Sequence, residues 1–283
     1  MTLFEESISN LQTIKSKRNP NNFNIIFFGD SWVNSGVVSD NIFEVAMLKA
    51  MDFNPLLFVH GGDAVFTGTA ANLEAFVTKV NTLNKDKEGN SVPFFLVPGN
   101  HDAAKTGNIL SLDNYRQIIG PPEIHWAVDL PEFNLKLIGL NTLYNYVYNE
   151  YGLTESELNF LENSLLNENH FKNIFVAMHV PPREPQLQWV GSDAFPDERG
   201  RTEFYRIVKD KVSRVLVSHI HDFQLAKAQG VRFILSGGGG ATLNVGALNH
   251  IVVINIRNYG LFNIVTPKFV PVGWTRASEP VSP

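Results

Sequence analysis

Polar side chains follow five apolar segments of this 283-residue protein, each at the point where the segment ends. They are carboxylates, imidazoles and one amide: Asp30, Asp63, Asn100, His101, Asp102, His179, His219 and His221. Such oxygen and nitrogen ligands suit Mn, Fe or Zn, and the sequence has no cysteine to offer in their place. A carboxylate such as Asp63 can bridge two metals roughly 3.5–4 Å apart, and such a pair clamps a phosphoryl group and activates a water.

Three strands expected in the first half would bring several of these groups to one sheet edge. The strands are predicted over 23–28, 56–59 and 93–97, with helices from Ser39 to about residue 51 and over 73–83 between them. This alternation of strand, polar turn and helix predicts an α/β fold with a largely parallel core sheet covered by helices. Ligands bind beyond the carboxyl ends of the strands in such sheets.

The second half is richer in predicted strands. Strands over 174–178 and 215–217 end at His179 and at the pair His219 and His221, which period-2 alternation places on one side of the sheet. A capping-box pattern, Thr154-Glu155-Ser156-Glu157, opens a predicted helix that runs to about residue 166. Further helices are expected over 3–16 and 202–211, further strands over 124–129 and 134–140, and a final antiparallel meander over 223–229, 231–235, 250–256 and 260–266.

The composition disfavours several kinds of protein. No run of about 18 apolar residues is present, so we expect no membrane span. The sequence has 23 basic and 28 acidic side chains, and its Lys and Arg residues form no cluster. This charge balance argues against nucleic acid as a partner and favours a small molecule. Because the N-terminus lacks a signal-peptide pattern, we expect a cytoplasmic protein, or a secreted one if a signal peptide has been removed.

We expect one domain over 1–283, with an N-terminal helix within 1–20 and a loosely held tail over 275–283. No internal repeat and no linker-like segment divides the sequence. The oligomeric state is left open by the sequence.

The order and spacing of the five polar groups resemble the sequence blocks of the calcineurin-like metallophosphoesterase superfamily. The blocks stand here as Gly29-Asp30-Ser31-Trp32, Gly62-Asp63-Ala64-Val65, Gly99-Asn100-His101-Asp102, His179 and Ser218-His219-Ile220-His221. The resemblance spans roughly residues 25–240. It implies a four-layer α/β/β/α sandwich of two mixed β-sheets, and a metal-dependent phosphatase or phosphodiesterase that acts on a small-molecule phosphoester.

The resemblance also implies a role for each matching position. One transition metal would be held by Asp63, Asn100, His179 and His219. A second would be held by Asp30, Asp63, His221 and the histidine of the first block. Together the two metals, Mn, Fe or Zn, would supply a hydroxide that attacks phosphorus in line. His101 would protonate the leaving oxygen, and Asp102 would orient His101.

Two positions depart from the pattern. Trp32 stands where the first block has its histidine, and an indole ring cannot ligate a metal. Purple acid phosphatases and their relatives also lack that histidine, but they supply a tyrosine at the position that is Phe66 here. The first metal site is therefore filled by water, completed by a nearby group such as Asn34, weak, or empty, so the centre is dinuclear or mononuclear.

Two alternatives follow from the residues. The first is a non-catalytic relative with a degenerate first metal site, which Trp32 and Phe66 favour. The second is a GDSL-type serine esterase, because Phe28-Gly29-Asp30-Ser31 resembles the opening block of that family and would make Ser31 a nucleophile. That family needs an Asp three positions before a histidine, and no histidine of this sequence has one.

Several conspicuous residues have a plainer interpretation. The histidines outside the blocks are expected to be structural or at the surface: His60, His125, His170 and His250. The run 237–240 of four glycines lacks the Lys-Ser/Thr of a phosphate loop and predicts a tight turn near the metal edge. Three arginines are expected to lie at the surface, although they could also meet a substrate phosphate: Arg183, Arg199 and Arg201.

Overall fold

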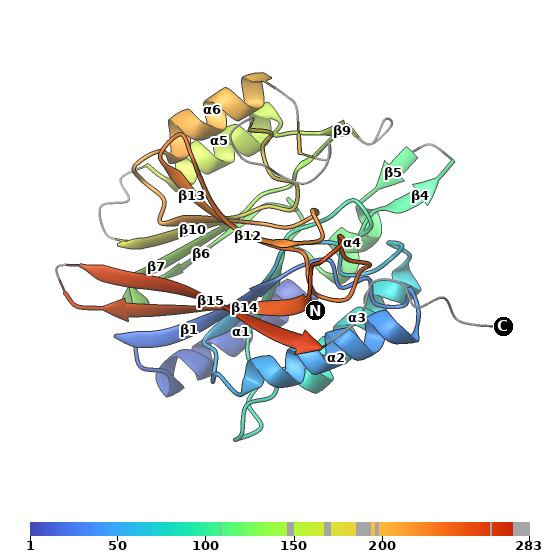
Figure 1. The fold of residues 1–283 in the computed structure, drawn as a ribbon, viewed down its shortest axis with the longest axis horizontal. Helices are drawn as coiled ribbons and strands as arrows, with labels where there is room; N and C mark the ends of the chain where they lie inside the picture. Colours follow the sequence, from blue (N-terminus) through green and yellow to red (C-terminus); the bar gives the residue numbers. More distant parts are fainter. Residues whose placement is uncertain are drawn as a thin grey trace.

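Two β-sheets pack face to face in this protein, a computed structural model, with helices on both outer faces (Figure 1). The structure describes residues 1–107, 109–145, 150–166, 171–184, 194–195, 198–260 and 262–273. The expected tail over 275–283 and His170 lie outside the described residues. Within the described ranges the four-layer α/β/β/α sandwich of two mixed sheets is confirmed.

The first sheet has five strands in the order β15-β14-β1-β2-β3. Its parallel part consists of β1 (Asn22–Phe28), β2 (Leu57–His60) and β3 (Phe94–Leu96), and the hairpin of β14 (Asn249–Asn258) and β15 (Asn263–Gly273) is antiparallel to β1. The apolar residues of β1 bury their side chains on both faces, as a central strand requires. The three strands predicted in the first half are confirmed to within one residue at each end.

Three helices cover the outer face of the first sheet, in the lower half of Figure 1. They are α1 (Leu3–Ile14), which continues into the short 3-10 turn η1 (Lys15–Lys17), α2 (Val37–Met51) and α3 (Ala70–Leu83). The expected start of α2 at Ser39 is wrong, because the helix begins after Gly36. The Ser39 hydroxyl instead accepts a hydrogen bond of 2.7 Å from Ser35.

The second sheet has six strands in the order β12-β13-β11-β10-β7-β6. Its parallel strands are β7 (Leu135–Gly139), β10 (Asn173–Ala177), β11 (Arg214–Val217) and β13 (Val231–Ser236). The antiparallel edge strands are β6 (Trp126–Leu130), which the turn η2 (Pro131–Phe133) joins to β7, and β12 (Phe223–Ala228). Helices α5 (Glu155–Ser164) and α6 (Glu198–Val208) lie on the outer face (Figure 1).

The start of α5 uses only half of the predicted capping box. The Thr154 hydroxyl accepts the N–H of Glu157, as expected. The Glu157 carboxylate, however, accepts the N–H of Asn141 at 3.0 Å and pairs with His125 at 2.9 Å. Glu157 therefore ties the helix to the second sheet instead of closing on its own N-cap.

Alternate residues of the inner strands face two different cores. In β11, Val215 and Val217 pack with the helices of the outer layer, whereas Leu216 packs against the first sheet. The same alternation places Ile234 of β13 in the core between the sheets, together with Phe27 of β1. This period-2 alternation lets one sheet bury both of its faces.

The expected single meander near the C-terminus is wrong. β12 and β13 form an antiparallel pair in the second sheet, whereas β14 and β15 form one in the first. The polypeptide passes from one sheet to the other because the apolar run of β14 completes the first sheet by pairing with β1, with Ile254 opposite Ile25. No helix in the described ranges is long and apolar enough to cross a membrane.

Short elements near the sheet edge were not predicted. They are β4 (Ala104–Thr106), β5 (Ile109–Ser111), α4 (Asp113–Ile118), β8 (Leu143–Asn145) and β9 (Glu150–Tyr151). Each spans too few residues for a hydrophobic period to show.

Candidate metal centre

The candidate site residues lie where strands of both sheets end. Asp30, Asp63 and Asn100 follow β1, β2 and β3, while His179 and His219 follow β10 and β11. Two contacts join the sheets at this edge: the His219 N–H donates to Asp30 Oδ2 at 2.9 Å, and His179 Nδ1 lies 2.8 Å from the Gly61 carbonyl. The two mixed sheets thus present their strand ends to one common centre.

Tight backbone turns direct three of these side chains toward the centre. The backbone φ angles of Asp30, Asp63 and His219 are 58°, 56° and 69°, in the left-handed region that non-glycine residues seldom adopt. Such a turn costs of order 1–3 kcal/mol and persists only where the surrounding structure enforces it. At Gly99, an added Cβ would lie 2.2 Å from Asp63 Oδ1, so only glycine leaves room for that carboxylate.

Four ligand atoms converge around His179. Its Nε2 lies 3.0 Å from His219 Nδ1, 3.2 Å from Asn100 Oδ1 and 3.4 Å from Asp63 Oδ1. We call Asp63, Asn100, His179 and His219 the His179 site. Among the described residues, its Asp63, His179 and His219 are the one group of three His, Cys, Asp or Glu whose ligand atoms all lie within 4.8 Å of one another.

The electrostatics of the His179 site favour a cation. Because the Gly61 carbonyl can only accept, His179 donates from Nδ1, and its Nε2 points toward two acceptor oxygens. Such a second bond, which fixes tautomer and ring orientation, is typical of metal-ligating histidines. Burial opposes charge on His179, yet the Asp63 carboxylate raises its pKa to about 9. The donor set therefore fits a transition-metal ion, which would replace that proton.

The second group of predicted ligands is less complete. His221 donates from Nδ1 to the Thr242 carbonyl, and its Nε2 lies 3.4 Å from Asp30 Oδ1. Asp30 is fully buried, and its Oδ1 accepts no hydrogen bond from any described residue. Burial opposes charge on His221, but its contact with Asp30 raises the pKa to about 9. We call these two residues the Asp30–His221 pair.

Trp32 occupies the position of the missing histidine. Its indole N–H donates to Asp63 Oδ2 at 3.4 Å, the carboxylate oxygen that does not face His179. Its ring lies edge-on to His221, with centroids 5.1 Å apart. Trp32 therefore supplies a hydrogen-bond donor, and no lone pair, where the family pattern has a ligand.

His101 lies against an aromatic wall beside the His179 site. Its ring is stacked on Phe66 at 5.4 Å and tilted against Trp32 at 4.8 Å. The His101 N–H donates to Asp63 Oδ1 at 2.8 Å, and its ring Nδ1 donates to the Phe66 carbonyl at 2.8 Å. The role of the Phe66 carbonyl could not be predicted, because residue type carries no signal for the direction of a backbone carbonyl.

The expectation that Asp102 orients the His101 ring is wrong. The Asp102 carboxylate accepts four backbone N–H groups, from Asp63, Ala64, Val65 and Gly99, at 2.8–3.3 Å. It is fully buried and binds the loop after β2 to the loop after β3. Burial and the Asp63 carboxylate raise the pKa of Asp102 to about 7, although the N–H donors favour the ionised form.

Two further expectations about the neighbourhood have clear outcomes. Asn34 does not complete the Asp30–His221 pair, because its side chain is exposed and donates to Asn72. Ser218 replaces a glycine of the family pattern without disturbing the centre. Its hydroxyl occupies the space beside Gly29 and Gly61, where an added Cβ would lie 2.2 Å and 1.9 Å from it.

The turn formed by residues 237–240 lies beside the centre, as predicted. An added Cβ on Gly237 would lie 2.8 Å from Asp30 Oδ2, and the Gly239 N–H donates to the Gly29 carbonyl. Of the three arginines singled out, Arg201 hydrogen-bonds to the backbone carbonyl of Arg183, which joins α6 to the segment after His179.

Ser31 is placed unlike the nucleophile of a serine esterase. It is fully buried, and its hydroxyl contacts His60 Nε2 at 2.9 Å and the Ala64 carbonyl at 3.2 Å. His60 Nδ1 accepts the N–H of Gly62, so its Nε2 carries the proton and donates to Ser31. The hydroxyl proton therefore goes to Ala64, and His60 cannot act as the base that such an enzyme needs.

The other described histidines also have structural partners. His250 donates from Nδ1 to the Leu248 carbonyl and accepts from the Ser236 hydroxyl, and it is fully buried. His125 pairs with Glu157. Neither contributes a ligand atom to the His179 site.

The protein belongs to the calcineurin-like phosphoesterase family, because the model of that family matches residues 23–223. A search of curated proteins by sequence found no match. The family match extends over every candidate ligand position described above.

Solved structures share the fold at low sequence identity. GAP50, the anchor in the inner membrane complex of Plasmodium, has a TM-score of 0.60 at 14% identity, and the match extends over 90% of this protein and 86% of that one. A putative 5'-nucleotidase from Staphylococcus aureus has a TM-score of 0.52 at 14% identity, and the match extends over 91% of this protein and 56% of that one. The phosphopantetheinyl hydrolase PptH from Mycobacterium tuberculosis has a TM-score of 0.52 at 12% identity, and the match extends over 77% of this protein and 89% of that one. Identities this low establish a shared fold, and activity must be argued from the site.

Proposed function

We propose that the protein is a metal-dependent hydrolase of phosphoester bonds in a small molecule, with Mn, Fe or Zn held by the His179 site. The observation that carries the proposal is the convergence of His179 Nε2, His219 Nδ1, Asp63 Oδ1 and Asn100 Oδ1 at the edge where strands of both sheets end. Family membership supports the phosphoester chemistry.

The protein's own residues would prepare the site for this reaction. A bound metal ion would polarise the phosphoryl group and lower the pKa of a water. The Gly61 carbonyl holds the His179 ring with Nε2 toward the centre, and the His101 N–H holds the Asp63 carboxylate. With Nδ1 committed to the Phe66 carbonyl, His101 has Nε2 available to pass a proton to the leaving oxygen.

We propose one tightly bound metal per protein molecule. The Asp30–His221 pair brings two ligands together, and the Trp32 N–H covers the Asp63 oxygen that would have bridged to it. With only these two ligands from the described residues, the pair would be a weak second site at most.

A non-catalytic role is the second candidate, and Trp32 is the observation that favours it. The fold is compatible with both functions, since its solved relatives include an anchor protein as well as a hydrolase. Metal content and hydrolysis, measured on the same preparation, separate the two candidates.

The test compares metal content and hydrolysis of bis-(p-nitrophenyl) phosphate and p-nitrophenyl phosphate between the wild type and three variants. We expect about one metal per wild-type molecule by elemental mass spectrometry. His219→Ala should lose the metal and the activity together, because it removes a ligand. His101→Ala should keep the metal and lose roughly 10²–10⁴-fold in turnover, because it removes only the proton donor.

His125→Gln is the matched control, since it changes a histidine outside the centre and keeps a partner for Glu157. It should match the wild type in both measurements. Metal without hydrolysis of either ester would favour the non-catalytic candidate. A wild-type protein that binds no Mn, Fe or Zn would refute the proposed metal site.

A further inference from the structure

A second pocket lies at the opposite end of the second sheet from the metal centre. It has a volume of about 540 Å³ and forms where β10, β11 and β13 begin and where the β14–β15 hairpin passes below them. The metal ligands follow the other ends of β10 and β11. The pocket is therefore separate from the His179 site.

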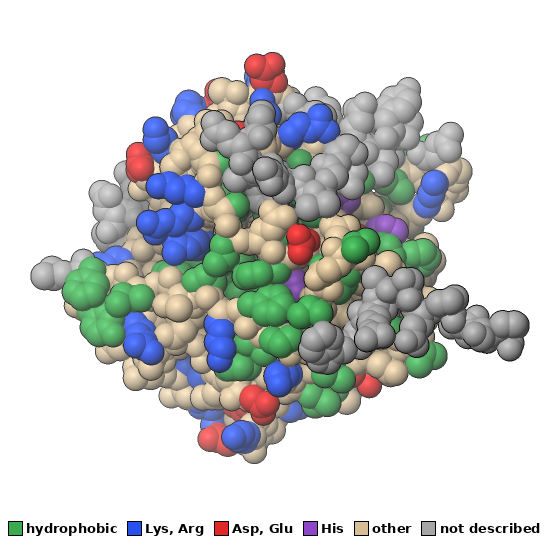
Figure 2. Space-filling view, viewed as in Figure 1, with side chains coloured by type: hydrophobic (Ala, Val, Ile, Leu, Met, Phe, Trp, Pro, Cys, Tyr) green, Lys and Arg blue, Asp and Glu red, His purple; other side chains and the backbone are tan. Residues whose placement is uncertain are grey.

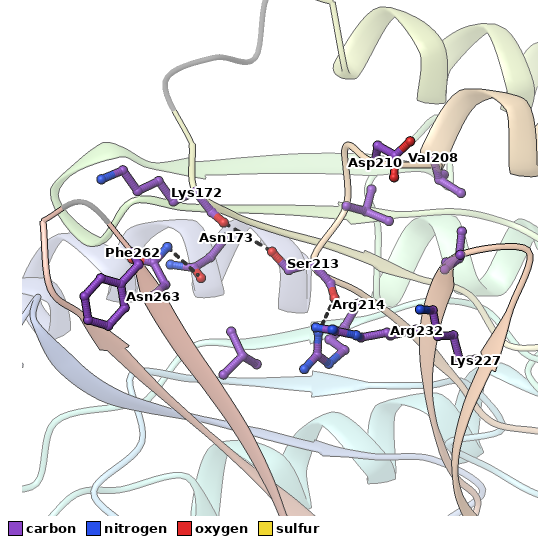
Figure 3. A pocket seen from close by; sticks show the side chains of 14 residues that line it. Lys172, Asn173, Val208, Asp210, Ser213, Arg214, Lys227, Arg232, Phe262 and Asn263 are labelled. Atoms are coloured by element: carbon purple, nitrogen blue, oxygen red, sulfur yellow. Dashed lines mark hydrogen bonds between the residues drawn. The ribbon is translucent and has the colours of Figure 1, made fainter.

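Cationic side chains dominate the polar lining of this pocket. Four cations face one carboxylate there: Lys172, Arg214, Lys227 and Arg232 against Asp210. No ion pair joins Asp210 to any of the four within the described ranges. Figure 3 shows Arg214, Arg232 and Lys227 close together on one side of the pocket, with Asp210 on another.

Three of these cations are neighbours across adjacent strands. Lys227 of β12 is directly opposite Arg232 of β13 in the antiparallel pair. Arg214 of β11 precedes Val215, whose partner is Phe233, so Arg214 and Arg232 are also neighbours. Like charges in such positions repel and destabilise a sheet. We call Arg214, Lys227 and Arg232 the cation row.

The members of the cation row lack the ion-pair partners that a purely structural role would require among the described residues. Among the described residues no carboxylate pairs with any of its members, and the Arg214 guanidinium donates to the Ser213 carbonyl at 2.6 Å. Arg214 is half-buried, and burial together with the Arg232 cation lowers its pKa from the usual value. Repulsion between members of the row is therefore not offset by an ion pair within the described ranges.

The remaining walls could accommodate the body of a small ligand. Phe262 at the tip of the β14–β15 hairpin is 59% exposed, and its ring stacks on Tyr259 at 5.2 Å. Figure 2 shows Lys and Arg side chains gathered on the left of the molecule, above the apolar side chains at the hairpin tip. An apolar rim beside clustered positive charge fits a ligand with both an anionic and an apolar part.

We propose that the cation row binds a phosphate-type oxyanion, carried by a small molecule, at a site independent of the metal centre. Guanidinium groups bind such oxyanions through paired, charge-assisted hydrogen bonds. Neutralising the row would relieve the repulsion between its members, so binding should also stabilise the folded protein.

The experiment measures binding of inorganic phosphate to metal-free protein at constant ionic strength, by calorimetry and by the shift of the melting temperature. We expect saturable binding that Arg232→Gln and Lys227→Gln each weaken by about tenfold or more. Lys49→Gln is the control, because it removes an exposed cation on α2. It should leave binding unchanged. Equal binding by the wild type and Arg232→Gln would overturn the proposal.

A second readout separates a binding site from a structural cluster. Without phosphate and at low salt, Arg232→Gln should melt at the same temperature as the wild type or higher, because it removes repulsion. A lower melting temperature would mean that Arg232 stabilises the fold, and it would count against the proposal. Vesicles of phosphatidylcholine with and without phosphatidylserine test whether the phosphate that binds the row belongs to a lipid headgroup. Arg232-dependent binding to the anionic vesicles alone would assign the row to lipid phosphate, and absence of binding to both probes would overturn the proposal.

Discussion

At the residue scale, the proposal of a single metal depends on Trp32. Its N–H donates to Asp63 Oδ2, and its ring contacts both His101 and His221. A histidine at this position would offer a nitrogen lone pair toward the Asp30–His221 pair in place of a proton. The backbone favours the exchange, since the φ angle of Trp32 is 46° and histidine tolerates that region better than a bulky indole.

We predict that Trp32→His raises the metal content from about one to about two ions per molecule, as measured by elemental mass spectrometry after dialysis. The physical reason is that the Asp30–His221 pair gains a third ligand and Asp63 Oδ2 is released to bridge. Trp32→Phe is the control, because it removes the N–H without adding a ligand. Equal metal content in the two variants would contradict this account of Trp32.

The strand ends, together with the resemblance to the family, predicted which side chains would meet, but not how they are held. The carboxylate, amide and imidazole positions were predictable because each follows an apolar strand. The bonds that orient them come from backbone carbonyls of Gly61, Phe66 and Thr242, and from the indole of Trp32. A carbonyl's direction depends on local backbone angles, which residue identity does not specify.

At the element scale, the loops after β2 and β3 are joined by a single buried carboxylate. Asp102 accepts N–H groups from both loops, and those loops carry Asp63 and Asn100. Its effect on the proposed reaction would therefore be indirect, through the placement of two candidate ligands. Leaving a buried N–H without its partner costs about 1–3 kcal/mol for each group.

We predict that Asp102→Asn lowers the free energy of unfolding by about 2–4 kcal/mol, because an amide NH2 cannot accept the N–H groups that one carboxylate oxygen now accepts. Metal affinity should fall with it, since two ligand loops lose their common anchor. Thermal unfolding and metal titration measure the two effects. Asp113→Asn, at an exposed carboxylate paired with Arg116, is the control. A loss no larger than that of the control would refute this role for Asp102.

The strands that lead to the candidate site, β1, β2, β3, β10 and β11, were predicted within a residue at each end, whereas the partners of the last four strands were not. β12 and β14 belong to different sheets, although the sequence places both in one C-terminal run of predicted strands. The choice depends on which sheet has an open edge, and that is a property of the assembled fold. The start of α2 was missed for a related reason, because Ser39 bonds to Ser35 and Gly36 opens the helix without a side-chain cap.

At the scale of the whole molecule, two histidines of the first sheet are buried in neutral form. Burial lowers the pKa of His60 to about 3 and that of His250 to about 4, both from an ordinary value of 6.5. In the unfolded protein both would take up protons below pH 6.5. Their contribution to stability is thus fully present above that pH and is lost as the pH falls toward the folded-state values. Asp102, with its raised pKa, acts in the opposite direction and reduces the slope.

We predict that the free energy of unfolding of the metal-free protein falls as the pH is lowered from 6.5 toward 4, because the unfolded state gains protons that buried His250 cannot accept. In His250→Gln that decline should be shallower by up to about 1.4 kcal/mol per pH unit, the contribution of one proton. Glutamine keeps a polar group near the Ser236 hydroxyl. If the substitution lowers the free energy of unfolding by the same amount at every pH, the slope against pH does not change. Urea denaturation at successive pH values, with a chelator present, provides both slopes. If the two slopes agree, His250 is not held neutral by the fold, and the prediction fails.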